Sequence, residues 1–166
     1  MINGLPGSGK TTLATSLGAA LGVPVVSKDA VKDALQATVP AAPPRTLGAT
    51  AIEAAWNLAA GIAGTVVLES WWFRPRDLGF AEVALKRCGD PAVVEVWCDV
   101  PATIAMQRYA NRSRPAFYED AQRMADSWPD WARRAEPLGL GRVLRVDTAS
   151  EVDIDALVRR LGAAAL

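Results

Sequence analysis

The stretch Gly4-Leu5-Pro6-Gly7-Ser8-Gly9-Lys10-Thr11, followed by Thr12, determines which fold this chain adopts. It fits the pattern G-x-x-x-x-G-K-[ST], a glycine-rich loop whose backbone N–H groups surround a phosphate. Glycines let such a loop turn tightly and approach a ligand without a Cβ in the way. Leu13, Leu17 and Leu21 then recur at helical spacing, so the loop opens a helix whose positive end faces the same anion. The sequence therefore predicts a phosphate-binding site here.

The loop's side chains have expected roles around a nucleoside triphosphate. Lys10 reaches the β- and γ-phosphates, the hydroxyl of Thr11 ligates Mg²⁺, and Thr12 contacts the α-phosphate. ATP and Mg²⁺ are thus the expected cofactors. The nucleotide-binding set includes Gly4, Leu5, Pro6, Gly7, Ser8, Gly9, Lys10, Thr11 and Thr12. The first strand is short, because only three residues precede Gly4, and the sequence leaves open whether the natural chain begins upstream of Met1.

Length and composition narrow the class of protein. The 166 residues predict one domain, residues 1–166, and 51% hydrophobic content is enough for a substantial core. The 18 basic and 18 acidic residues give no net charge, which argues against a nucleic-acid partner. The apolar runs are too short to span a membrane. With no histidine, acid–base work falls to carboxylates. Cys88 and Cys98 form no C-x-x-C pattern, so we expect reduced thiols in a cytoplasmic protein.

Apolar runs alternate with helical stretches along the chain. The pattern predicts strands at 1–3, 23–27, 65–69, 92–98 and 143–147, and helices at 10–21, 29–36, 47–60, 77–87, 101–111, 119–135 and 152–164. The proline-rich residues 38–46 and the residues 71–76 are expected to be loops. Such an alternation predicts an α/β fold with a parallel sheet and helices on both faces. Ligands of these sheets bind beyond the carboxyl ends of the strands.

Polar residues follow three of the expected strands. Asp29 comes just after the second strand, where its carboxylate can accept the proton of an attacking hydroxyl; the simpler interpretation is a helix cap. Glu69 ends the most apolar strand and either binds Mg²⁺, directly or through water, or binds the acceptor; the simpler interpretation is a solvated charge. Thr148, after the last strand, is a weaker candidate for the adenine pocket, and a simple turn is at least as good an interpretation.

Three arginines predict a lid over residues 108–120. Arg108 and Arg112 lie four residues apart on one helix face, and Arg114 follows before a proline. Guanidinium groups stabilise the charge on a phosphoryl group in transfer, so Arg112 is a catalytic candidate and Arg108 a nucleotide-binding one. Ordinary surface charge is the alternative.

Aromatic residues mark the expected acceptor side. Trp71 and Trp72 follow Glu69 directly, where their indole faces can stack on an acceptor, with Arg74 or Arg76 binding an anionic group. Packing in the core is an equally good interpretation of the two tryptophans.

In the order of these parts the chain resembles small P-loop kinases of the nucleoside-monophosphate-kinase-like group. That group includes gluconate and shikimate kinases, chloramphenicol phosphotransferase, zeta-toxin-type kinases and AAA-type small kinases. The resemblance implies a P-loop NTPase fold: a three-layer αβα sandwich with a five-stranded parallel sheet and a short helical lid. It also implies transfer of the γ-phosphate of ATP to a hydroxyl of a small sugar, nucleoside or antibiotic-like acceptor. The acid after the second strand, often the catalytic or acceptor-binding group, maps onto Asp29, and the lid arginines map onto Arg108, Arg112 and Arg114. The chain departs from the group at Glu69, where many members have Asp.

Two other functions stay open at this point. One is an ATPase or nucleotide switch that acts on a protein partner, although no switch segment is evident. The other is a nucleic-acid end kinase, which the neutral net charge disfavours. The sequence does not select the acceptor.

Overall fold

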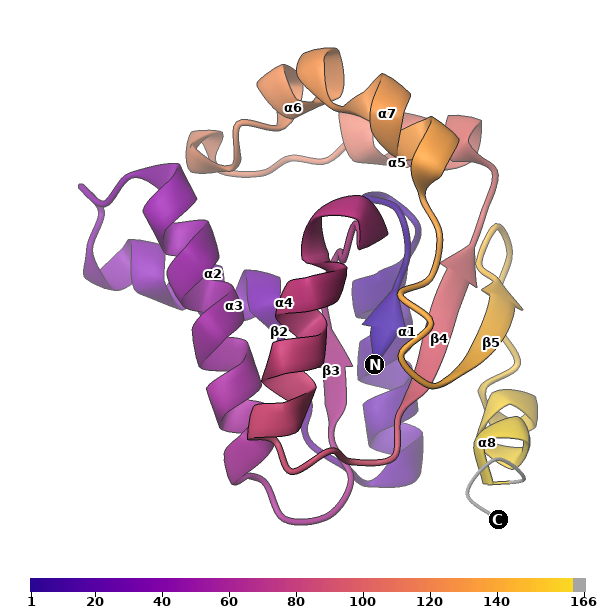
Figure 1. The fold of residues 1–166 in the computed structure, drawn as a ribbon. Coiled ribbons are helices and arrows are strands. Elements are labelled where there is room, and N and C mark those ends of the chain that lie inside the picture. Colours follow the sequence, from indigo (N-terminus) through magenta and orange to yellow (C-terminus); the bar gives the residue numbers. More distant parts are fainter. Residues whose placement is uncertain (163–166) are drawn as a thin grey trace.

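A computed structural model describes residues 1–162 and shows a single parallel sheet between layers of helices (Figure 1). The strands are β1 (Ile2–Asn3), β2 (Val25–Ser27), β3 (Val67–Glu69), β4 (Val94–Asp99) and β5 (Arg142–Asp147), in the order β2-β3-β1-β4-β5. The helices are α1 (Lys10–Leu21), α2 (Lys28–Thr38), α3 (Pro44–Gly61), α4 (Arg74–Arg87), α5 (Ala102–Ala110), α6 (Asp120–Asp126), α7 (Trp128–Arg134) and α8 (Ile154–Gly162). Within residues 1–162, none is long and apolar enough to cross a membrane.

Two hydrophobic clusters hold helices on opposite faces of the sheet. On one face α1 and α8 pack through Leu13, Leu17 and Leu157. On the other, α3 and α4 pack through alanines and Trp56. The predicted three-layer αβα sandwich with five parallel strands is therefore confirmed. The helix expected at 152–164 is α8, and residues 163–164 lie outside the described part of the chain.

A further group of helices covers the carboxyl ends of the strands. Figure 1 shows α5, α6 and α7 lying across this end of the sheet. The single helix predicted at 119–135 is wrong, because the chain forms α6 and α7 with a break at Ser127. Pro129 explains the break, since it has no N–H to donate four residues back and its ring clashes with that carbonyl. The covering layer is thus larger than the predicted lid at 108–120.

Two helices begin at least three residues earlier than the sequence predicted, and both have a proline in the first turn. α3 starts at Pro44 and α4 has Pro75 in its first turn, inside segments that were expected to be loops. The first turn of a helix tolerates proline because its N–H groups have no partner within the helix. Pro44 and Arg45 therefore belong to α3 and not to a loop.

A buried carboxyl group connects the central strands to the chain before β5. Glu95 on β4 is 1% exposed and accepts hydrogen bonds from Asn3 Nδ2 (2.9 Å) and from the N–H groups of Leu138 and Gly139 (both 2.9 Å). Asn3 in turn donates to the Trp72 carbonyl (3.2 Å) and accepts from the Trp72 N–H (3.0 Å). This network fixes β1, which has only two residues.

Glu95→Ala should destabilise the fold by about 2 kcal/mol or more, because the buried Leu138 N–H loses its acceptor and the Asn3 and Gly139 donors each lose a charge-assisted hydrogen bond. Urea denaturation followed by circular dichroism measures the change. Glu82→Ala, at an exposed position on α4, is the matched control and should change stability by less than about 0.5 kcal/mol. Equal effects of the two substitutions would contradict this role of Glu95.

Candidate active site

The glycine loop between β1 and α1 is packed against two other elements. Gly7 and Gly9 have φ values of 86° and 89°, which favour glycine. A Cβ on Gly7 would lie 2.1 Å from the Ala105 carbonyl oxygen of α5, and one on Gly4 would lie 2.9 Å from the Cys98 Cβ of β4. Both positions therefore need glycine for close approach, as the motif predicted, and the loop lies directly against α5.

Side chains of the loop divide between the core and an adjoining cavity. Leu5 is buried in a cluster with residues of α5 and α7, whereas Pro6 and Thr11 line the cavity and Thr12 is exposed. Lys10 Nζ donates to the Leu5 carbonyl (3.0 Å) and also lines the cavity. Burial lowers the pKa of Lys10, and the nearby carboxylate of Glu69 partly opposes this.

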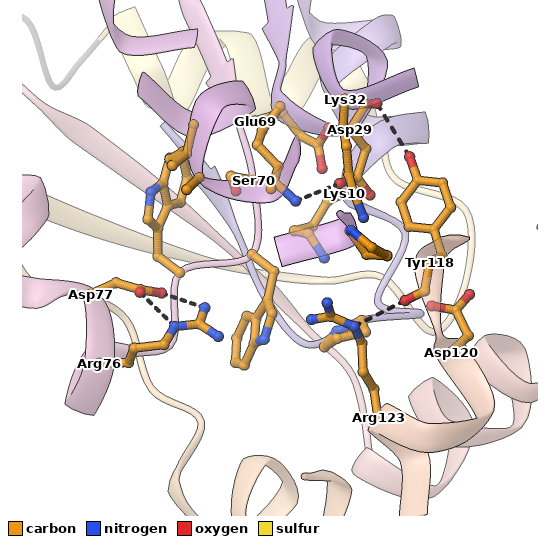
Figure 2. Close-up of a pocket in the computed structure, with 18 of the residues that line it drawn as sticks. Lys10, Asp29, Lys32, Glu69, Ser70, Arg76, Asp77, Tyr118, Asp120 and Arg123 are labelled. Atoms are coloured by element: carbon orange, nitrogen blue, oxygen red, sulfur yellow. Dashed lines mark hydrogen bonds and ion pairs between the residues drawn. The ribbon is translucent and has the colours of Figure 1, made fainter. Parts of the chain in front are cut away.

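The cavity has a volume of ≈ 520 Å³ and lies between the glycine loop, α2, α3, α4 and the covering helices. Its size is typical of a small-molecule site. Figure 2 shows Lys10, Asp29 and Glu69 near one another, with Arg76 and Tyr118 on opposite sides of the view. Its wall is rich in cations: Lys10, Lys28, Lys32, Arg45, Arg76, Arg112, Arg114 and Arg123.

Glu69 and Thr11 line the cavity together with Lys10, and both have side-chain oxygens that suit a metal ion. Glu69 is buried, and its Oε2 accepts from the Ser27 hydroxyl (2.6 Å), a contact that joins the ends of β3 and β2. Mg²⁺ prefers hard oxygen ligands, takes only one or two from protein, and completes its shell with phosphates and water. The hydroxyl of Thr11 and the carboxylate of Glu69 fit that chemistry. In the part of the chain that the structure describes, no cluster of three or more acidic, Cys or His residues forms a protein-only metal site.

Asp29, at the start of α2, is held by two cations. Lys28 Nζ lies 3.1 Å from Oδ1. Arg114 lies 2.5 Å from Oδ2 and belongs to the chain between α5 and α6, residues 111–119, which we call the covering segment. Burial acts to raise the pKa of Asp29, but Lys28 and Arg114 outweigh it and lower the pKa to about 2. The carboxylate is therefore fully ionised at neutral pH. The helix-cap role belongs to Ser27, whose Oγ accepts from the Ala30 N–H.

Tyr118 docks the covering segment on α2. Its hydroxyl donates to Asp33 Oδ1 (2.6 Å), and its carbonyl accepts from Arg123 Nε (2.9 Å). The Arg114 guanidinium lies 3.6 Å from the centre of the Tyr118 ring, and Lys32 Nζ lies 4.4 Å from it. The covering segment is thus tied to α2 by the Arg114–Asp29 ion pair, the Tyr118 hydroxyl and the cation–π contact of Lys32, while the Arg114–Tyr118 contact lies within the segment.

Comparison with known proteins identifies the family. The AAA_33 family, described as an AAA domain, matches residues 1–138. The chain belongs to this AAA domain family. A search of curated protein sequences finds no match.

Solved structures similar to this AAA domain include several kinases. A candidate kinase of Chloroflexus aurantiacus J-10-fl has a TM-score of 0.75 and 23% identity, covering 98% of this chain and 96% of that one. Shikimate kinase of Bacteroides thetaiotaomicron has a TM-score of 0.63 and 18% identity, with 98% and 94% covered. A sugar kinase of Janibacter sp. HTCC2649 has a TM-score of 0.59 and 18% identity, with 98% and 91% covered. These likenesses establish a P-loop kinase-like fold.

Arg108 of the AAA domain lies apart from the cavity wall, unlike the other two predicted lid arginines. Its guanidinium donates to the carbonyls of Thr148 (2.8 Å) and Ala149 (2.7 Å), whereas Arg112 and Arg114 line the cavity. A Cβ on Gly9 would lie 3.8 Å from the Thr148 Cβ. Arg108 therefore fixes the loop after β5 beside the glycine loop. Sequence spacing placed Arg108 and Arg112 on one face, but α5 ends at Ala110, so the two side chains diverge.

The structure places the acceptor-side candidates differently from one another. Arg74 does not line the cavity, because it donates to the Leu138 carbonyl (3.2 Å) and pairs with Glu136 (3.0 Å); Arg76 lines it instead. Trp72 borders the cavity, but it is 1% exposed and its ring centroid is 6.1 Å from that of Trp56, so most of the side chain packs in the core. Trp71 is half-buried and lines the cavity, which keeps it available for an acceptor.

Lys32, Tyr118 and Arg123 line the cavity although the sequence analysis did not select them. Lys32 was detectable, because it lies three residues after Asp29 on the same face of a helix. Tyr118 and Arg123 gave no such signal, since their place depends on how the covering helices fold back.

Arg114→Gln should raise the pKa of Asp29 from about 2 toward its ordinary value of 3.8, because one of its two cations is removed. A carboxylate with a lowered pKa stabilises the fold above pH 3.8 and loses that contribution as the pH falls toward 2. The variant should therefore lose stability less steeply over this range. NMR titration of the Asp29 carboxyl measures the shift directly. Arg133→Gln, which removes an exposed partner of Asp130, is the control and should leave the titration unchanged.

Proposed function

We propose that this AAA domain is an ATP-dependent kinase that transfers the γ-phosphate to a hydroxyl of a small acceptor. The observation that carries the proposal is the shared cavity of Lys10 and Asp29. Lys10 belongs to the phosphate-binding loop that follows β1. Asp29 is an ionised carboxylate that follows β2, and in the sheet β3 lies between these two strands. A phosphoryl donor and an acceptor would thus have adjoining places in one cavity.

The charge of the wall supports phosphoryl transfer. Negative charge spreads over the equatorial oxygens of the transferring group, and fixed cations stabilise it. Lys10 from the loop and Arg112 from the end of α5 approach the cavity from different elements. Within residues 1–162 the Lys10 ammonium group donates to the Leu5 carbonyl (3.0 Å), which leaves two of its three N–H donors for phosphate oxygens.

Asp29 is assigned the role of binding the hydroxyl group of the acceptor. The acceptor oxygen bonds to the γ-phosphorus as the bond from that phosphorus to the β,γ-bridging oxygen breaks, ADP leaves, and the acceptor's proton passes to the Asp29 carboxylate. A pKa of about 2 makes Asp29 a weak base, so its main work is to orient the hydroxyl and to take the proton late. Mg²⁺, held by Thr11 and Glu69 together with the phosphates, would neutralise charge on the β- and γ-oxygens.

Water exclusion distinguishes a kinase from an ATPase. Tyr118 and Arg114 tie the covering segment to α2 beside Asp29, whose side chain is still 38% exposed. A closed site protects the phosphoryl group from water and favours a positioned acceptor. The volume of ≈ 520 Å³ suits a small acceptor of the sugar, nucleoside or antibiotic-like kind.

Lys10→Ala should weaken ATP binding by about 10-fold or more, because it removes a charge-assisted contact to the phosphates. Calorimetric titration with ATP and magnesium measures the affinity. Lys86→Ala is the matched control, since Lys86 lies on α4 and does not line the cavity. Equal affinity of wild type and Lys10→Ala would remove the loop from nucleotide binding.

Asp29→Asn should keep the ATP affinity within about twofold while phosphate transfer falls by about 10²-fold. An acceptor is found first by screening sugars, nucleosides, aminoglycosides and phenicols for an ATP-dependent gain of one phosphate by mass spectrometry. Asp155→Asn, at an exposed site on α8, is the control and should transfer at the wild-type rate. Hydrolysis of ATP that no acceptor competes with would favour an ATPase instead.

A further inference from the structure

Lys32 is a buried cation with no acidic partner. It is 2% exposed, it lines the cavity one helical turn after Asp29, and among residues 1–162 its ammonium group makes no ion pair or hydrogen bond. Burying an ammonium group costs several kcal/mol unless a partner compensates. Natural interiors seldom contain such a group without a reason that involves a ligand or a partner.

The aromatic rings next to Lys32 compensate for only part of this cost. Lys32 Nζ lies 4.4 Å from the centre of the Tyr118 ring and 5.0 Å from that of Phe117. Such contacts contribute about 2 kcal/mol when desolvated, and they leave the three N–H donors of the ammonium group without an acceptor.

Other cations surround Lys32 and make its position electropositive. Burial lowers its pKa to about 8, and Lys28, Arg123 and Arg114 act in the same direction, while Asp29 opposes them. Asp29 is already paired with Lys28 and Arg114, so it does not neutralise Lys32. An oxyanion bound here would meet several cations that are positioned before it arrives.

From these contacts we propose that Lys32 binds an anionic group of the phosphate acceptor, a carboxylate or a phosphate. This inference rests on the proposed kinase function and specifies its substrate class. Asp29 takes the hydroxyl that is phosphorylated, and Lys32 takes the oxyanion about 5–6 Å further along the same face of α2. The acceptor is thus a compact hydroxy acid or hydroxyl-bearing phosphate ester. The anionic group of the acceptor also contacts Arg114, whose guanidinium lies against the Tyr118 ring. This contact couples binding of the acceptor to the position of the covering segment.

The first test measures binding without catalysis. Wild type, Lys32→Met and Lys86→Met are loaded with magnesium and a non-hydrolysable ATP analogue, so that the glycine loop is occupied. Each is then titrated calorimetrically with inorganic phosphate at constant ionic strength. Lys32→Met should bind phosphate about 10- to 100-fold more weakly than the other two proteins. Equal phosphate affinity in all three proteins, or no saturable binding in wild type, would overturn the proposal.

The second test uses matched acceptors that differ in one anionic group: glycerol against glycerate and glycerol 3-phosphate, and glucose against gluconate. Wild type and Lys86→Met should prefer the anionic member by about 10-fold or more, and Lys32→Met should lose the preference with the KM for ATP unchanged. Lys32→Arg should keep part of it. Equal use of neutral and anionic acceptors in wild type would reject the role of Lys32 while the kinase function stands.

Thermal unfolding of Lys32→Met separates ligand binding from a structural role. A lysine that only holds Tyr118 in place would lower the midpoint when it is replaced. An unpaired cation kept for a ligand should leave the midpoint equal or higher, because methionine removes the buried charge. Failure of wild type to bind any ATP analogue would reject the kinase function itself. Phosphate would then be titrated into wild type and Lys32→Met without the analogue, and weaker binding by Lys32→Met would still show that Lys32 binds an anion.

Discussion

The close packing of the glycine loop against β4 and α5 is the constraint on which the site depends. β1 has two residues, too few to position a loop by itself, and it is held by its neighbours and by the buried Asn3–Glu95 contact. Because Gly7 has no Cβ, the loop reaches the Ala105 carbonyl, and α5 is fixed directly beside it. The chain that leaves α5 carries Arg112 and Arg114. A backbone contact therefore sets the distance between the proposed phosphate site and the cations of the covering segment.

The residues around the cavity have more positive than negative charge. The whole chain has no net charge, yet basic residues outnumber acidic ones around the cavity. Asp29 is balanced by Lys28 and Arg114, whereas in the described part of the chain the Lys32 ammonium group lies against aromatic rings and makes no ion pair. Buried charge without a partner disfavours the folded state, so such a site gains stability when an anion binds. On the functions proposed above, ATP and an anionic acceptor would supply that charge from two directions.

Prediction from the sequence succeeded where one local pattern was sufficient. The glycine loop, the order of strands and helices, and the strand-end positions of Asp29 and Glu69 all follow from short-range spacing, and the fold confirms their places. It failed where the direction of a side chain depends on distant chain. Arg74 and Arg76 are two residues apart, but Arg74 is drawn to Glu136 and only Arg76 reaches the cavity. The helix predicted at 119–135 failed for a local reason, Pro129, which the hydrophobic pattern concealed.

By itself the sequence determined that this chain forms a parallel α/β sheet with a phosphate-type loop at its first strand, because glycine positions and hydrophobic periodicity act over a few residues. Only the tertiary structure decided which cations share the cavity. Lys32 and Tyr118 are 86 positions apart in the chain, and their contact exists because α2 and the covering segment fold toward each other over the end of the sheet. That approach is set by packing and by the Tyr118–Asp33 hydrogen bond, neither of which a linear pattern encodes.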